Sequence, residues 1–327
     1  MTAQLPLLTS QQVLDNMPDP LRAVELMRDG LIAIADGSAS TTPKAQVKSG
    51  FADTKSANNA GSAMPAAWPD RNLLGIKWLA ITPSNATDKE ANPNGLPTID
   101  GVMVLNDARD GHIRAIMPAA ELTGLRTAAV TGASLAIDAD NAEGTFDAAK
   151  LRPITFLGTG VQARSHAQVL SAMGIEKLTV WGRREEALEE LKQWAAENTP
   201  DLELVTTTDR TESLKGAGII ISGVAMYQPG LLFDPAEIAD DATLLPLDYG
   251  TMVGADLVKK GLLVSDDADQ FKGLMPKKFP KEYPAPEGYT GELLTKPRPD
   301  GLVIAQNLGS GLNDLLIADE IVSSLGY

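Results

Sequence analysis

The chain has 327 residues, 43% of them hydrophobic and 22% charged, which is enough for one large or two ordinary globular domains. Its formal net charge of −15 argues against nucleic acid or an anionic membrane as a partner. The sequence has no cysteine and only two histidines, His112 and His166, so disulfides and thiolate sites are excluded and no metal is expected.

The N-terminus, MTAQLPLLTSQQ, has neither the basic start nor the apolar run of a signal peptide. No segment offers the ~18 consecutive apolar residues that a membrane-spanning helix needs. We therefore expect a cytoplasmic protein without a membrane partner.

The N-terminal part of the chain predicts helices mixed with antiparallel strands. Thr9 is a cap-like residue before a short helix, and residues 19–35 have the pattern of an amphipathic helix. Residues 73–82 predict a strand, and the stretches PTIDGVMVLND and HIRAIMPAA are typical of a hairpin that turns around Asp110 and Gly111. Hairpins beside helices indicate an α+β domain.

The segment ELTGLRTAAVTGASLAI predicts a helix with a stripe of small residues, Ala128, Gly132 and Ala136, which suits close packing against another element. From Pro153 onward, apolar stretches alternate with helical or turn segments, a rhythm typical of a parallel sheet wrapped by helices. These stretches are ITFLG, LTVWG, LELVTT, GIIISGV, TLLPLD and LLVSD.

We therefore predict an α/β protein that combines a Rossmann-type, doubly wound parallel sheet with a smaller α+β domain. The smaller domain comprises residues 1–127 with 306–327, because the last helix is expected to return to it. Residues 128–305 form the predicted dinucleotide-binding domain.

The stretch FLGTGVQARSH contains a dinucleotide-binding pattern, G-x-G-x-x-A, made by Gly158, Gly160 and Ala163. The first glycine permits a tight turn, the second lets the backbone approach a pyrophosphate, and the small third residue lets the helix pack on the strand. The helix N-terminus then offers N–H groups and a partial positive charge to the phosphates. The alternative is a flavodoxin-like turn that binds no ligand.

Two arginines stand where an NAD site usually carries an acidic residue, at the end of the second strand of the pattern. In WGRREE these are Arg183 and Arg184, and an arginine there pairs with the 2′-phosphate of NADP(H). NADP(H) is therefore preferred and NAD(H) remains possible. Alternatively, both arginines are solvated charges at the start of a helix.

The combination of ELTGLRTAAV with FLGTGVQARSH resembles the ornithine cyclodeaminase/μ-crystallin family, and GIKW, GLPTIDGVMVLND, PLDYG and NLGSGLNDLLIAD extend the resemblance over most of the chain. The resemblance implies an NAD(P)-dependent oxidoreductase that acts on CH–NH or CH–NH2 bonds of an amino or imino acid. It also implies a homodimer that is formed, like the substrate site, by the α+β domain.

The resemblance assigns acid/base work to Lys77 and Asp248, and substrate-carboxylate binding to Arg126. Burial in an apolar strand would lower the pKa of Lys77 toward a useful value, although a lysine that snorkels at a strand edge is the alternative. Asp248 ends an apolar strand, where it could also cap a turn, and Arg126 could instead form a structural salt bridge. Where the family usually has a second arginine for the carboxylate, this chain offers Lys44 or Lys48.

The candidate cofactor contacts lie in the LRTAA helix, the glycine turn and the ends of two later strands. They are Thr127, Gly158, Thr159, Gly160, Val161, Gln162, Arg183, Arg184, Ser222 and Gly223.

Three functions remain open from the sequence. The first is an NADP-dependent reductase of an imine or ketimine, or the same enzyme running in reverse as an amino-acid dehydrogenase. The second is a cyclodeaminase that recycles a bound NAD. The third, of another class, is an NADPH-dependent binding protein like μ-crystallin, which the retained Lys77, Arg126 and Asp248 disfavour because binding alone needs no acid/base pair.

Overall fold

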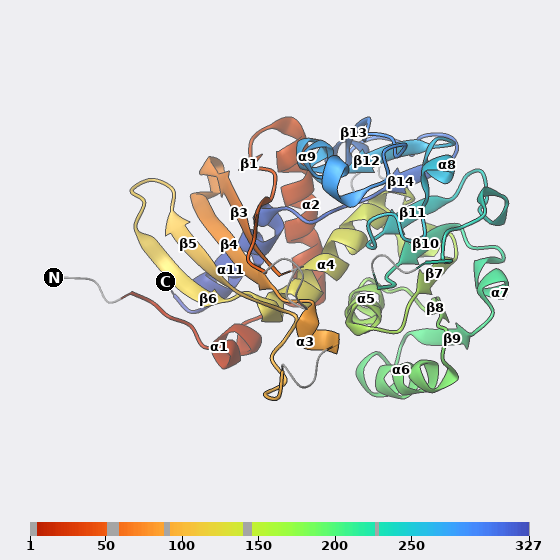
Figure 1. Ribbon diagram of the computed structural model, residues 1–327, viewed down its shortest axis with the longest axis horizontal. Helices are drawn as coiled ribbons and strands as arrows, with labels where there is room; N and C mark the ends of the chain where they lie inside the picture. Colours follow the sequence, from red (N-terminus) through yellow and green to blue (C-terminus); the bar gives the residue numbers. More distant parts are fainter. Residues whose placement is uncertain (1–4, 51–58, 88–91, 140–145, 226–228, 327) are drawn as a thin grey trace. The chain divides into compact units, whose positions relative to one another are not determined.

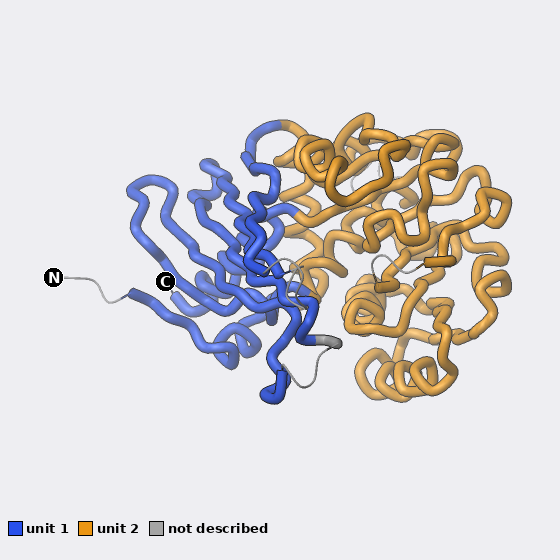
Figure 2. Tube along the Cα trace, viewed as in Figure 1, with its two compact units in different colours: residues 1–18, 37–123, 310–327 blue, residues 19–36, 124–309 orange. Residues whose placement is uncertain are grey.

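The structure is a computed structural model that describes residues 5–50, 59–87, 92–139, 146–225 and 229–326. It divides into two compact units (Figure 2): unit 1 comprises residues 1–18, 37–123 and 310–327, and unit 2 comprises residues 19–36 and 124–309. Within the described ranges, every helix is too short or too polar to cross a membrane.

Unit 1 is built on a six-stranded antiparallel sheet in the order β1-β3-β4-β5-β6, with β2 also paired to β3 (Figure 1). Its strands are β1 (Ser40–Thr41), β2 (Ala45–Lys48), β3 (Ala60–Trp68), β4 (Leu73–Ile81), β5 (Ile99–Asp107) and β6 (Ile113–Pro118). The predicted hairpin is β5 and β6, and Gly111 takes a positive φ of 80° in its turn. Strand β3 was not predicted, because AGSAMPAAW lacks the β-branched residues that mark a strand.

The helices of unit 1 are α1 (Ser10–Asp15), η1 (Pro69–Arg71), α3 (Ser84–Thr87) and α11 (Gly311–Ser324). Thr9 caps α1 through a reciprocal pair of hydrogen bonds with Gln12, as its position predicts. Helix α11 covers one face of the sheet and contacts β3, β4 and β5. Two glycines allow this close approach, because a Cβ on Gly75 would lie 2.6 Å from Leu315 and one on Gly311 would lie 2.4 Å from the Met64 carbonyl oxygen.

On the other face of this sheet, several described apolar side chains are exposed. Along β4, residues alternate between buried and exposed, so the side chains of Leu74 and Trp78 are 38% and 43% exposed. Val102, which pairs with Trp78 across β4 and β5, is 40% exposed. An apolar face of this kind usually marks a surface that another protein covers.

Unit 2 is built on an eight-stranded parallel sheet in the order β13-β12-β14-β11-β10-β7-β8-β9 (Figure 1). Its strands are β7 (Ile154–Leu157), β8 (Lys177–Trp181), β9 (Glu203–Thr207), β10 (Ile219–Ser222), β11 (Thr243–Pro246), β12 (Leu262–Ser265), β13 (Gly288–Tyr289) and β14 (Val303–Ala305). The chain runs from β7 outward through β8 and β9, then returns to β10 on the other side of β7. The topological switch point, where ligands bind in such sheets, therefore lies between β7 and β10.

The helices of unit 2 are α2 (Pro20–Asp36), α4 (Ala120–Ser134), which begins in unit 1, η2 (Leu135–Ile137), η3 (Ala148–Lys150), α5 (Val161–Ala172), α6 (Glu185–Asn198), α7 (Arg210–Leu214), η4 (Pro235–Glu237), α8 (Ala255–Val258), α9 (Ala268–Lys278) and α10 (Thr290–Leu293). The small-residue stripe of α4 does allow close packing. A Cβ on Gly132 would lie 2.8 Å from Val24 of α2 and 3.0 Å from Val169 of α5. The predicted domain boundaries stay a prediction, although the compact units differ from them in placing residues 19–36 with the parallel sheet.

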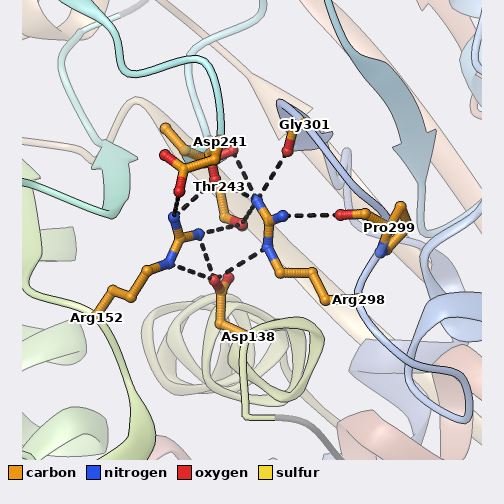
Figure 3. A network of polar contacts seen from close by, with 8 residues as sticks. Asp138, Arg152, Asp241, Thr243, Arg298, Pro299 and Gly301 are labelled. Carbon is orange, nitrogen blue, oxygen red and sulfur yellow. Dashed lines mark hydrogen bonds and ion pairs between the residues drawn. The ribbon is translucent and has the colours of Figure 1, made fainter.

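A charged network holds the amino-terminal edge of the parallel sheet together (Figure 3). Asp138, 1% exposed and just after η2, accepts from Arg152, and Arg298 Nε lies 3.2 Å from the same carboxylate oxygen. Arg152 and Arg298 also both donate to the carbonyl oxygen of Asp241 and to the hydroxyl of Thr243 at the start of β11. These bonds join segments that precede β7, β11 and β14, so they fix the edge opposite to the glycine turn.

Candidate functional site

The glycine turn lies at the switch point, between β7 and α5. Gly158 has a φ of 130°, and a Cβ there would lie 2.7 Å from the carbonyl oxygen of Gly223, so only glycine fits. Gly160 precedes α5 with an ordinary φ of −80°, and a Cβ there would meet no atom within 4 Å. The protein itself therefore does not require a glycine at this position, whereas a phosphate that approaches the backbone would. Ala163 is buried, as the pattern predicts.

The end of β8 lies against this turn. A Cβ on Gly182 would lie 2.5 Å from the Thr159 side chain, so the glycine lets the two loops touch. Arg183 and Arg184 follow and are exposed, and within the described ranges the structure shows neither of them in a hydrogen bond or an ion pair. Two exposed arginines beside a dinucleotide turn can accept a phosphate group.

Strand β10 brings Ser222 and Gly223 to the same edge. The backbone N–H of Gly223 donates to the carbonyl oxygen of Leu157 at 2.8 Å, which continues the pairing of β10 with β7. The other predicted cofactor residues of this region are Val161, which is exposed, and Gln162, which is partly buried, both in the first turn of α5.

Asp248 lies two residues beyond β11 and is fully buried. Its Oδ1 accepts from the backbone N–H of Thr251 at 3.1 Å, so the predicted capping role exists. Burial raises the pKa of Asp248 to about 6, and the hydrogen bonds from the backbone N–H groups of Thr251 and Met252 only partly offset this. A carboxyl with such a pKa can bind and release a proton near neutral pH.

Two buried residues beside Asp248 were not predicted from the sequence. The Tyr283 hydroxyl donates to Gln306 Oε1 at 2.6 Å, and Gln306 directly follows β14, the neighbour of β11. Burial and the nearby charge of Asp248 raise the pKa of Tyr283 above its usual value, so this tyrosine stays protonated.

Tyr249 takes a positive φ of 50°, which is uncommon for a residue with a side chain.

Lys77 lies on the covered face of unit 1 and is 1% exposed. It therefore does not snorkel at a strand edge. Its Nζ lies 2.7 Å from Asp314 Oδ1 of α11 and 2.9 Å from Thr123 Oγ1 of α4. Met64 and Met103 flank it on the neighbouring strands and are buried too. The ion pair with Asp314, 237 residues away along the chain, was not predicted.

The proposed carboxylate-binding residues are Arg126 and Lys44. Arg126 in α4 is partly buried and lies against the backbone of Gly309, where a Cβ would come within 2.5 Å of its Nη1. Gly309 has a φ of 77°, so it is suited to this close approach. Thr127 and Lys44 are also partly buried.

The two histidines form hydrogen bonds within their own regions of the fold. His166 is buried, donates from Nδ1 to the Gln162 carbonyl at 2.8 Å, and accepts at Nε2 from the Thr131 hydroxyl at 3.0 Å. Burial lowers its pKa to about 4, so it is neutral at physiological pH. His112 lies in the β5–β6 turn with Asp107 and Asp110, three groups close enough to share an ion, but the carboxylates accept hydrogen bonds within the turn.

A glycine turn at the switch point of a parallel sheet, joined to a second unit with an antiparallel sheet, defines a two-unit protein with a Rossmann-type dinucleotide site. Residues 10–235 match the model of the ornithine cyclodeaminase/mu-crystallin family, and the chain belongs to that family. The expected family and fold class are thereby confirmed.

Relatives and solved structures agree with this assignment. The chain is 28% identical over 294 residues to Δ1-pyrroline-2-carboxylate reductase of Paracoccus denitrificans, covering 88% of this chain and 81% of the relative. Its fold is similar to Thermococcus litoralis Δ1-pyrroline-2-carboxylate reductase in complex with NADH and L-proline, with a TM-score of 0.76, 18% identity and coverage of 98% and 97% of the two chains. It is equally similar to the iminosuccinate reductase of Paracoccus denitrificans in complex with NAD+, with a TM-score of 0.76, 19% identity and coverage of 98% and 95%. The expected class, an NAD(P)-dependent oxidoreductase acting on CH–NH or CH–NH2 bonds, agrees with the family and with the reductase relative that spans most of the chain, while the solved structures show the fold.

Proposed function

We propose that this protein reduces the carbon–nitrogen double bond of an imino acid, with NADPH as the preferred cofactor. The observation that carries the proposal is the buried carboxyl of Asp248, whose pKa of about 6 lets it deliver a proton near neutral pH. Because the relative that spans most of the chain is named for Δ1-pyrroline-2-carboxylate, a cyclic imino acid is the first substrate class to test.

The nicotinamide, when bound, supplies the hydride that the imine carbon receives. Asp248 supplies the proton that the nitrogen needs, and its backbone hydrogen bonds from Thr251 and Met252 hold the carboxyl in place. Lys77 is the second side chain, after Asp248, that takes part in the reaction. Arg126, with Lys44, attracts the substrate carboxylate, and the missing second arginine changes how that carboxylate is placed, because lysine lacks the planar fork of donors.

The cofactor preference rests on Arg183 and Arg184. Both are exposed, and both follow the strand that ends beside the glycine turn. Among the described residues, neither arginine has an ion-pair partner. A 2′-phosphate gives such arginines a charged partner, whereas the 2′-hydroxyl of NAD(H) gives them none.

We also propose a homodimer. Its support is the open face of the antiparallel sheet, where Leu74, Trp78 and Val102 expose large apolar side chains. Covering these side chains with the same face of a second copy would remove them from water.

The test is a screen of carboxylate-bearing imines, cyclic ones and those formed from keto acids with amines, with NADPH and NADH in parallel. The proposal expects steady oxidation of NADPH that matches the amount of amino acid formed. A cyclodeaminase would instead convert a diamino acid without net cofactor turnover. A binding protein would change the NADPH fluorescence on mixing and oxidise it with none of the imines.

A further inference from the structure

We propose that Asp314 is a positioning residue that keeps Lys77 protonated and fixed, so that Lys77 acts as a permanent positive charge and Asp248 alone transfers the proton. The inference deepens the proposed function and rests on it for the substrate class. It also makes a claim about the charge of Lys77 that can be tested without any substrate.

The directions of the hydrogen bonds around Lys77 support this role. Thr123 donates its hydroxyl hydrogen to the Ala119 carbonyl at 2.9 Å, so toward Lys77 its oxygen accepts. Asp314 presents a carboxylate oxygen, which also accepts, at a distance of 2.7 Å that is typical of a charge-assisted bond. Lys77 Nζ therefore donates to both partners.

The fold holds this geometry tightly. Gly311 lies against the Met64 backbone and Gly75 lies against Leu315, so α11 has little freedom to shift over β3 and β4. Asp314 is one helical turn beyond Gly311, and Lys77 is two residues beyond Gly75 on the same face of β4. Both side chains are buried, at 0% and 1% exposure.

Among the described residues, Asp314 forms an ion pair with Lys77. Strands β3 and β5 present Met64 and Met103, and α4 presents the hydroxyl of Thr123. A buried ion pair of this kind is often no more stable than a hydrophobic pair of similar volume, so stability alone is weak grounds for its presence. The ion pair has a purpose if it keeps the positive charge of Lys77 fixed, so that this charge can attract an anionic substrate.

The first experiment measures stability and needs no substrate. Asp314→Asn leaves a buried ammonium beside a neutral amide, so the folded state binds that proton less tightly than the unfolded chain does. Because the unfolded state then binds more protons, the stability of D314N should recover toward that of the wild type as pH rises from about 6 to about 9. The double variant K77M/D314N should lose less stability than the two single variants summed.

The second experiment measures activity with the imine found by the screen. At about pH 8, kcat/KM of D314N should fall by about 10- to 100-fold, because Lys77 of this variant has lost its proton at that pH. At lower pH, Lys77 is protonated again and the loss should be smaller. Asp314→Glu keeps the charge and should keep the pH midpoint of the wild type, even at a lower rate. Thr123→Val removes a hydrogen bond but no charge, and should also keep that midpoint.

Two results would overturn the inference. One is a stability difference between wild type and D314N that stays constant with pH while the pH–rate profiles coincide, which would make the ion pair purely structural. The other is a D314E midpoint displaced from the wild type, a result that stays measurable if D314N does not fold. If the wild type reduces no imine, the proposed function fails, and the stability experiment still decides whether Asp314 keeps Lys77 charged.

Discussion

A Cβ placed on Gly158 would lie 2.7 Å from the carbonyl oxygen of Gly223. The two glycines follow β7 and β10, the strands on either side of the switch point, so this contact closes the protein side of the turn. Gly160, two residues on, faces open space instead. The fold thus requires a glycine at Gly158 but not at Gly160, and we propose that Gly160 instead leaves room for a ligand.

Replacing each glycine by alanine should separate these purposes. Gly158→Ala places a side chain at a φ of 130° and against a backbone oxygen, so it should lower the melting temperature and cofactor affinity together. Gly160→Ala should leave the melting temperature unchanged and weaken NADPH binding by about tenfold or more, because the methyl group occupies the space that a phosphate needs. Thermal unfolding and a fluorescence titration measure both effects. Equal affinity of G160A and wild type for NADPH would show that no cofactor phosphate lies against Gly160.

Removing the two arginines should change the cofactor preference. In the double variant Arg183→Ser with Arg184→Ser, NADPH binding should weaken by about 10- to 100-fold while NADH binding changes little, because charge-assisted hydrogen bonds to the 2′-phosphate are lost. Lys192→Ala, an exposed cation further along α6, is the matched control and should affect neither cofactor. Parallel losses for both cofactors would mean that the arginines do not read the 2′-phosphate.

Local patterns predicted the parts of the site that depend on short segments. The glycine turn, the buried Ala163 and the position of Asp248 at a strand end all follow from residues close together in the sequence. The alternation of apolar stretches likewise predicted the parallel sheet, because each strand and its following helix are local units.

The parts that were missed depend on distant residues or on weak local signals. Asp314 reaches Lys77 only because α11 packs on β4, and no spacing rule links residues 237 positions apart. Tyr283 lies in a proline-rich segment that predicts only an irregular loop, yet its hydroxyl bonds to Gln306 beside Asp248. Strand β3 has small residues and a proline, so it forms because β2 and β4 pair with it, not because of its own propensity.

The raised pKa of Asp248 predicts how stability depends on pH. In the folded protein this carboxyl keeps its proton up to about pH 6, whereas in the unfolded chain it loses the proton near its ordinary pKa of 3.8. The folded state therefore binds more protons in that window, so this group destabilises the fold progressively as pH rises through it. Asp248→Asn should remove the effect and be more stable than wild type by about 3 kcal/mol above the window, and equal to it below. Denaturant unfolding of both proteins across this range measures the difference, and a difference that does not change with pH would contradict the assignment.

The apolar face of the antiparallel sheet predicts a dimer that a single charge can break. Trp78→Glu should shift the protein from dimer to monomer, because the carboxylate would lose its water on a covered apolar surface. Leu232→Glu changes another exposed apolar side chain, in unit 2, and should leave the mass unchanged. Sedimentation or light scattering of the three proteins reads out the state. A wild type that is already monomeric would rule out this interface.

The most direct test of imine reduction follows the hydride. NADPH carrying deuterium at either face of its C4 is consumed with a cyclic imino acid, and the amino-acid product is examined by mass spectrometry and NMR. The proposed function predicts one deuterium at the carbon that was double-bonded to nitrogen, from one of the two labelled cofactors, in equal amount to the cofactor oxidised. An amino acid without deuterium from either cofactor, or product formed without net NADPH oxidation, would contradict it.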